Sequence, residues 1–186
     1  PFADALVARK GTINVHSVHA LSTQFEPQLF TANARVRADA ENIFKKVCYA
    51  GAVLGAKYFT FHGPVRLKDK EYVFDYAKLG DRINQLSEIA QAYGLRISYE
   101  NVHWTYFNNP DYFRHLKLHC PNLGATLDIK QAMQSGINVY KFLDIMADRL
   151  TTVHLCDYNA KGETRIPGQG KFNFEKLFRE LDTLNT

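Results

Sequence analysis

The chain has 186 residues, of which 46% are hydrophobic and 23% are charged, and its formal net charge at pH 7 is +4. This composition excludes an intrinsically disordered chain and fits one soluble domain over residues 1–186 with a sizeable core. The basic residues are scattered rather than gathered into a run, so charge does not indicate a nucleic-acid partner, and no apolar run approaches the roughly 20 residues that a membrane-spanning helix needs.

Helical and extended patterns alternate along the chain. In chain order we expect a helix at 2–10, a strand at 13–20, a helix at 34–54, a strand at 57–62, one helix or two at 72–93, a strand at 95–101, a helix at 111–119, a strand at 124–128, a helix at 140–146, a strand at 150–157 and a helix at 174–184. Gly11, Gly55 and Gly94 follow helical segments, as glycine does at helix ends. This alternation predicts right-handed βαβ units and a parallel sheet.

All five predicted strands carry the same three-residue pattern near their ends: a small hydroxyl residue, an apolar residue and a residue able to bind metal. The triplets are Ser17–His19, Thr60–His62, Ser98–Glu100, Thr126–Asp128 and Thr152–His154. Because side chains alternate between the faces of a strand, the hydroxyl and the metal-binding side chain share one face and the apolar residue points the other way. A single histidine or carboxylate at a strand end is more often structural than a metal ligand, but five repeats of the pattern predict a metal-binding site.

The spacing of the triplets favours a (β/α)8 TIM barrel over an open doubly wound sheet. In a barrel the apolar residues face the outer helices, and the metal-binding side chains form a ring at the C-terminal rim, where barrel active sites lie. An open sheet would spread the same side chains along a line. Mixed carboxylate and imidazole donors suit a divalent cation, and Mn, Zn, Fe, Co and Mg all fit. We interpret His16, His115 and His119 as structural or surface residues.

The cysteines and the chain ends carry two further expectations. Three cysteines without CxxC spacing predict reduced thiols in a cytoplasmic protein. The chain starts at Pro1 without Met and ends in a predicted helix, so we expect a barrel truncated at both ends. The unpaired outer strands of such a barrel would then be covered by a longer chain or by a second copy, as in a homo-oligomer.

Five sequence segments resemble the sugar phosphate isomerase/epimerase family, which shares the xylose isomerase-like barrel with endonuclease IV in the AP endonuclease 2 superfamily. They are HGP at 62–64, YEN at 99–101, LDIKQ at 127–131, VHLCD at 153–157 and RIPGQGKFNF at 165–174. The resemblance runs from about residue 13 to the end of the chain. It implies that the visible strands are the third to the seventh of eight.

The resemblance also implies roles for particular residues. Glu100, Asp128 and His154 match the family's metal ligands on its fifth, sixth and seventh strands. The family's fourth ligand, a Glu on the eighth strand, has no counterpart here. Arg165 matches an arginine that contacts substrate oxygens in related epimerases. The residues expected to bind substrate are His19, His62, Trp104, Gln131 and Arg165.

The predicted chemistry is isomerisation or epimerisation of a sugar or sugar phosphate. A cation would stabilise an enediolate, and Glu100 would be the proton-transfer base. The alternative is an endonuclease IV-like phosphodiesterase, for which His19 and His62 match two zinc ligands. Against it, Gln131 stands where that family has a histidine, and the Asp-Arg-His triplet has no counterpart around residues 162–165. A non-catalytic metal-binding or ligand-binding barrel is the third hypothesis.

Overall fold

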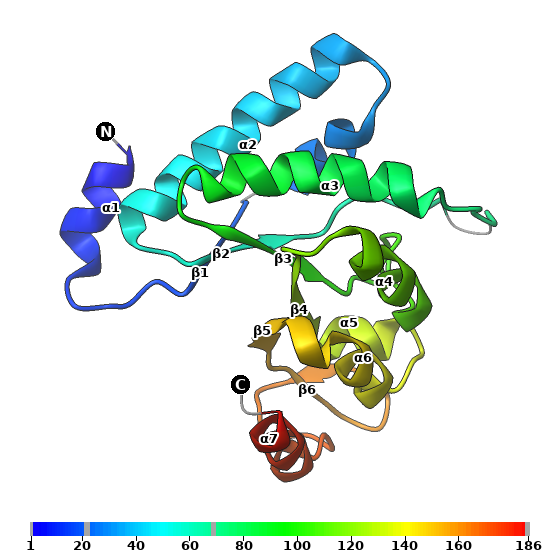
Figure 1. Cartoon of the computed structure of the whole chain (residues 1–186). Helices are drawn as coiled ribbons and strands as arrows, with labels where there is room; N and C mark the ends of the chain where they lie inside the picture. Colours follow the sequence, from blue (N-terminus) through cyan, green and yellow to red (C-terminus); the bar gives the residue numbers. More distant parts are fainter. Residues whose placement is uncertain (1, 21–22, 68–69, 185–186) are drawn as a thin grey trace.

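The computed structural model describes residues 2–20, 23–67 and 70–184, and the five predicted strands form one parallel sheet within them (Figure 1). The strands are β1 (Ser17–His19), β2 (Tyr58–Phe61), β3 (Arg96–Glu100), β4 (Gly124–Asp128) and β5 (Leu150–His154), and they pair in sequential order. A doubly wound sheet would reverse its order at a switch point, whereas a barrel wall continues in one direction. The prediction of a TIM-barrel arrangement is therefore confirmed.

The strands are staggered as a barrel requires. The last residue of β1 lies opposite Thr60, and the last residue of β3 lies opposite Thr126, each two residues before the metal-binding residue of the neighbouring strand. The last residues of β4 and β5 are level with each other. A shift of about two residues for every two strands matches the shear of 8 in an eight-stranded TIM barrel. Because the strands are tilted, this stagger keeps the strand ends at a common rim.

Helices cover the outer side of this sheet. The α-helices are α1 (Phe2–Lys10), α2 (Ala34–Leu54), α3 (Tyr76–Gln91), α4 (Pro110–Leu116), α5 (Ile129–Gln134), α6 (Val139–Met146) and α7 (Phe174–Thr183). Three short 3-10 helices are η1 (Thr23–Phe30), η2 (Lys117–His119) and η3 (Ala147–Arg149). Helix α2 packs on β1 and β2, α3 on β3 and α6 on β4. No helix in the described ranges combines the length and apolar character needed to cross a membrane.

The apolar residues of the strand triplets lie in the core between sheet and helices. Phe61, Tyr99 and Leu127 are fully buried, while the side chains of the two outer strands are only partly covered. Cys48 and Cys120 are buried as well, and all three cysteines are free thiols, as predicted. The alternation of side chains predicted from the sequence is therefore correct for the faces of the three central strands.

Several predicted boundaries differ from the structure because local side-chain contacts end the elements. Residues 13–16 lie outside β1. Helix α3 begins at Tyr76 rather than at 72 because the Asp75 carboxylate accepts a hydrogen bond from the backbone N–H of Lys78 and so caps the helix. Strand β5 ends at His154, and the chain then forms a short hairpin. Its strands are β6 (Asp157–Tyr158) and β7 (Thr164–Arg165), which the sequence did not indicate.

Asp157 organises the segment that follows this hairpin. Its Oδ1 accepts hydrogen bonds from the backbone N–H groups of Tyr158 (2.8 Å) and Phe172 (2.9 Å), and its Oδ2 accepts from Gly168 (3.0 Å) and Gly170 (2.7 Å). A Cβ atom at Gly170 would collide with this carboxylate. Desolvation acts to raise the pKa of Asp157, but the four backbone hydrogen bonds together outweigh it and lower the pKa. One carboxylate thus closes residues 157–172 into a fixed loop.

We predict that Asp157→Asn lowers the thermal midpoint by roughly 5 °C, because a carboxamide nitrogen cannot accept the N–H groups that one carboxylate oxygen accepts. Because the folded-state pKa is lower than the ordinary value of 3.8, the carboxylate stabilises the fold above about that pH, and the stabilisation is lost as pH falls through the lower pKa. Thermal melts of both proteins from pH 7 to pH 3 measure this. Asp144→Asn on the exposed side of α6 is the matched control, and equal midpoints for the two variants would contradict the prediction.

Candidate metal and substrate site

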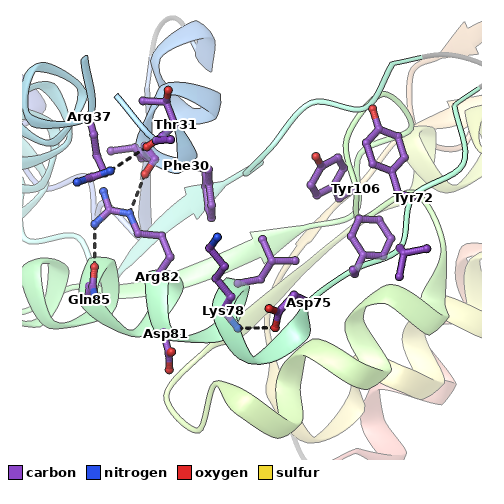
Figure 2. A pocket seen from close by; sticks show the side chains of 15 residues that line it. Phe30, Thr31, Arg37, Tyr72, Asp75, Lys78, Asp81, Arg82, Gln85 and Tyr106 are labelled. Carbon is purple, nitrogen blue, oxygen red and sulfur yellow. Dashed lines mark hydrogen bonds between the residues drawn. The ribbon is translucent and has the colours of Figure 1, made fainter. Parts of the chain in front are cut away.

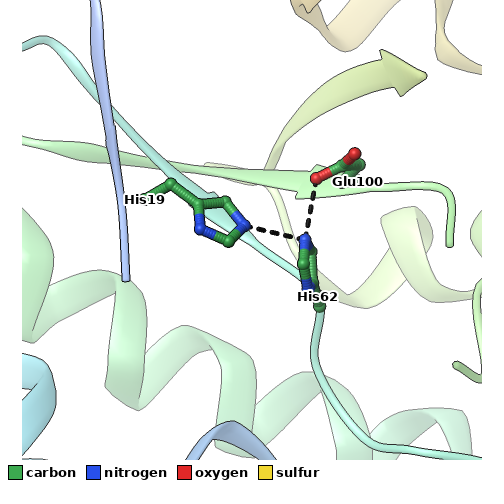
Figure 3. Close-up of side chains that lie close together, drawn as sticks. All are labelled: His19, His62 and Glu100. Atoms are coloured by element: carbon green, nitrogen blue, oxygen red, sulfur yellow. Dashed lines mark hydrogen bonds and ion pairs between the residues drawn. The ribbon is translucent and has the colours of Figure 1, made fainter. Parts of the chain in front are cut away.

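Glu100 lies at the centre of a cluster of imidazoles and carboxylates at the C-terminal ends of the strands. Its Oε2 is 2.9 Å from Nε2 of His62 (Figure 3), and its Oε1 is 3.2 Å from Nδ1 of His154. Only 3% of Glu100 is exposed to solvent. A buried carboxylate is costly unless it is paired, so the two imidazoles on either side are what permit its burial.

The cluster contains two sets of three side chains that could hold a metal ion, and the two sets share Glu100. One set is Glu100, Asp128 and His154, and the other is His19, His62 and Glu100; in each set the donor atoms lie within 4.8 Å of one another. Asp128 completes the first set with its Oδ2 at 3.5 Å from Nδ1 of His154. The structure thus brings together all five strand-end side chains. Their roles in metal or substrate binding stay predictions.

The electrostatics of the first set fit a bound cation. Burial raises the pKa of Glu100, but hydrogen bonds from His154 and His62 outweigh it and lower the pKa to about 2. Hydrogen bonds to Asp128 and to Glu100 raise the pKa of His154 to about 9 despite burial. The two carboxylates therefore favour positive charge at one point between them. Oxygen and nitrogen donors at that point suit the divalent metals expected from the sequence.

The second set has a fixed arrangement of donors and acceptors at His19. Its Nδ1 lies 2.7 Å from the carbonyl oxygen of Ala20, which can only accept, so Nδ1 carries the proton and Nε2 has a lone pair. This Nε2 is 2.8 Å from Nε2 of His62 (Figure 3). Burial, followed by the neighbouring His62, lowers the pKa of His19. A neutral imidazole with its lone pair directed into the cluster is what metal coordination requires.

The remaining predicted residues follow strands β3, β4 and β5 and have protein partners of their own. The Trp104 ring stands edge-on to the His62 ring, with centroids 5.4 Å apart. Gln131 accepts a hydrogen bond from the backbone N–H of His103 at 3.2 Å, and the same oxygen is 2.6 Å from Nδ1 of that residue. Arg165 lies on the β6–β7 hairpin and pairs with Glu163 at 2.7 Å, so its guanidinium is engaged within the hairpin, and its role in substrate binding stays a prediction.

Glu26 is a residue of this site that the sequence did not reveal. It lies in η1, is fully buried, and its Oε2 accepts hydrogen bonds from the backbone N–H groups of His62 (2.8 Å) and Gly63 (3.0 Å). Desolvation raises its pKa to about 7. Its position after β1, followed by Pro27, resembles an ordinary loop in the sequence. The one available signal was an acidic residue within the apolar segment 25–30.

A cavity of about 660 Å³ lies beside η1 and the start of α3, away from the cluster (Figure 2). Phe30, Tyr72 and Tyr106 line it together with Arg37 and Arg82. The two arginines donate hydrogen bonds to neighbouring protein atoms rather than into empty space. None of the five strand-end side chains lines this cavity, so the metal-binding side chains lie outside it, at the rim of the sheet.

Comparison with known proteins gives one family and several solved structures. The family model described as xylose isomerase-like TIM barrel matches residues 2–186. A D-tagatose 3-epimerase-like protein has a TM-score of 0.77 and 21% identity over 98% of this chain and 72% of its own. The IOLI protein with a binding zinc atom has a TM-score of 0.76 and 19% identity over 98% of this chain and 68% of its own. The 3-keto-D-glucoside 4-epimerase YcjR from E. coli has a TM-score of 0.76 and 17% identity over 98% of this chain and 73% of its own.

No curated protein sequence matches the chain. The structural likeness at these identities shows the fold alone, so the activity has to be argued from the site.

The two oxygens of Asp128 have different partners. Its Oδ2 faces His154 in the cluster, whereas its Oδ1 accepts a hydrogen bond from the backbone N–H of Gln131 (2.8 Å) and caps α5. We predict that Asp128→Ala destabilises the protein by about 1 kcal/mol, whereas Asp128→Asn keeps the cap and most of the stability. Both variants should weaken zinc binding by roughly 10–100-fold or more, since both remove the carboxylate beside His154. Chemical denaturation and zinc titration measure the two effects. Equal stability of the two variants would remove the capping role.

Proposed function

The chain belongs to the xylose isomerase-like TIM barrel family, and from that premise we propose that it is a metal-dependent isomerase or epimerase of a sugar or sugar phosphate. The observation that carries the proposal is the meeting of Glu100, Asp128 and His154 at the C-terminal ends of three neighbouring strands. In TIM barrels this rim holds the active site. Two of the similar solved structures are described as epimerases or epimerase-like, and a third as binding zinc, which supports the same class.

Glu100, Asp128 and His154 would hold the divalent cation. When bound, such a cation supplies Lewis-acid stabilisation of the negative charge that develops on a sugar carbonyl as the neighbouring carbon loses a proton. Mn, Zn, Co, Fe and Mg are all compatible with a mixed oxygen and nitrogen donor set.

In this proposal Glu100 moves the proton. Its two oxygens face different neighbours, Oε1 toward His154 and Oε2 toward His62, so Oε1 would bind the cation beside His154 and Oε2 would exchange its contact with His62 for the substrate proton. A pKa near 2 keeps Glu100 ionised but makes it a weak base. The acidity of the substrate C–H bond must therefore be increased for the transfer to occur, which explains why a carboxylate of this kind would work beside a cation.

The other side chains of the rim would bind the sugar. His19 and His62 carry nitrogen atoms that can hydrogen-bond hydroxyl groups. Gln131 lies next to Asp128, to which its backbone N–H donates a hydrogen bond. Trp104 would cover the apolar C–H face of the ring, since its indole already packs beside His62. Arg165 would have to exchange its ion pair with Glu163 for the substrate.

The second candidate function is phosphodiester hydrolysis, as in endonuclease IV. The set of His19, His62 and Glu100 favours it, because this set could hold another ion beside the first. Gln131 argues against it, since its oxygen faces His103 rather than the cluster and it stands where a third histidine would be needed. We therefore rank the isomerase first.

We predict that the protein isomerises or epimerises at least one ketose or ketose phosphate when supplied with Mn, Co, Zn or Mg. Glu100→Gln should lower turnover by roughly 10²–10⁴-fold, because it removes the ionised proton acceptor. Product analysis by chromatography across a ketose panel measures this. Glu88→Gln on the exposed side of α3 is the matched control and should retain full activity. Equal turnover by the Glu100 variant and the unaltered protein would disprove the assigned base.

We also predict one tightly bound ion per chain and no cleavage of abasic DNA. Metal analysis after dialysis counts the ions, and a labelled duplex with one abasic site reports cleavage. Two or three ions together with strand cleavage would reverse the ranking of the two candidate functions.

A further inference from the structure

Two buried polar atoms next to the site have no hydrogen-bond partner within the described residues: Nδ1 of His62 and Oε1 of Glu26. The second polar atom of each side chain is engaged. Nε2 of His62 faces Glu100 and His19, and Oε2 of Glu26 accepts the backbone N–H groups of His62 and Gly63. A buried polar atom without a partner is unfavourable, so a pair of them beside the same residue calls for an explanation.

The two atoms become complementary when His62 uses its Nε2 lone pair. An imidazole that gives this lone pair to a cation carries its proton on Nδ1, which is then a donor that needs an acceptor. The free Oε1 of Glu26 is an acceptor without a donor. The 2.8 Å bond from the His62 main chain to Oε2 already fixes this carboxylate beside the residue whose ring it would serve.

The surroundings hold both residues in place. Gly63 has a φ of 72°, and a Cβ atom there would collide with the Tyr99 hydroxyl, so the chain after β2 has little freedom to shift. On the other side, the carbonyl oxygen of Leu29 in η1 accepts a 2.7 Å hydrogen bond from Nε of Arg82 on α3. Glu26 thus belongs to a segment anchored to the helix layer, and a small rotation of either side chain is the movement still available.

We infer that Glu26 is a positioning residue. Its Oε1 accepts a hydrogen bond from the protonated Nδ1 of His62 and holds the ring with Nε2 directed at Glu100. Histidines that bind metal ions commonly donate their other N–H to a carboxylate, which fixes both ring orientation and tautomer. The inference rests on the proposed function in requiring that the cluster binds a divalent cation, and it goes further by having Nε2 of His62 join Glu100 in holding that cation, in place of the sugar contact given to His62 above. It assigns Glu26 no contact with substrate.

The test is a zinc titration of the uniformly ¹⁵N-labelled protein, followed by long-range ¹H–¹⁵N NMR of the histidine rings, with zinc affinity measured by chelator competition. In the unaltered protein zinc should shift Nε2 of His62 and leave a proton on Nδ1. Glu26→Gln keeps one oxygen for the two main-chain N–H groups but replaces the other with an NH₂ group, which cannot accept. This variant should lose the protonated Nδ1 signal and bind zinc at least about tenfold more weakly.

Glu88→Gln is the matched control, because Glu88 lies on the exposed side of α3 and its change should leave the His62 signals and zinc affinity unchanged. If zinc shifts the His154 signals while Nδ1 of His62 stays unprotonated in the unaltered protein, the inference is wrong and the proposed metal site stands. Equal zinc affinity and equal His62 signals in the Glu26 variant would also overturn it. If zinc shifts none of the ring signals, both proposals fail. The first measurement needs no variant, so a folding defect in Glu26→Gln cannot hide the answer.

Discussion

The burial of one negative charge, the carboxylate of Glu100, is the constraint on which the rest of the site depends. A carboxylate with 3% exposure is tolerated only if hydrogen bonds and positive charge surround it. His62 at the end of β2 and His154 at the end of β5 supply the hydrogen bonds, and the Asp128 carboxylate adds a further demand for positive charge. The same arrangement that makes the fold acceptable without a cation makes the site suitable for one.

The sheet beneath the cluster is tied together by polar side chains rather than by apolar packing alone. Ser98 forms hydrogen bonds of 2.5 Å to Thr126 and 2.6 Å to Thr151, which connect β3, β4 and β5 through side-chain hydroxyls. One residue beyond Glu100, the Asn101 side chain donates to the carbonyl oxygen of Asp128 (2.9 Å) and accepts from its backbone N–H (2.7 Å). These contacts fix the relative heights of the Glu100 and Asp128 carboxylates, as precise binding of a small cation would require.

The loops beyond the strands form a second layer that depends on buried carboxylates of its own. Glu26 holds the chain after β2, and Asp157 holds the segment after β5 by four backbone hydrogen bonds. The loops after β2 and β3 also pair with each other through a bridge between Val65 and Thr105. Loop backbone at the rim is therefore fixed by side-chain acceptors, so that the substrate would meet a preformed surface.

The sequence by itself determined the alternation of strands and helices, the faces of the central strands and the gathering of five strand-end side chains. These follow from local periodicities of 2.0 and 3.6 residues, which can be recognised without knowledge of distant contacts. Only the tertiary structure decided the roles of Glu26 and Asp157, because both act on backbone N–H groups that no sequence pattern marks. It also showed that Arg165 pairs with Glu163 within the β6–β7 hairpin, a hairpin that no sequence pattern indicated. Contacts between residues far apart in the chain, such as Glu26 with His62, exist only once the barrel wall has formed.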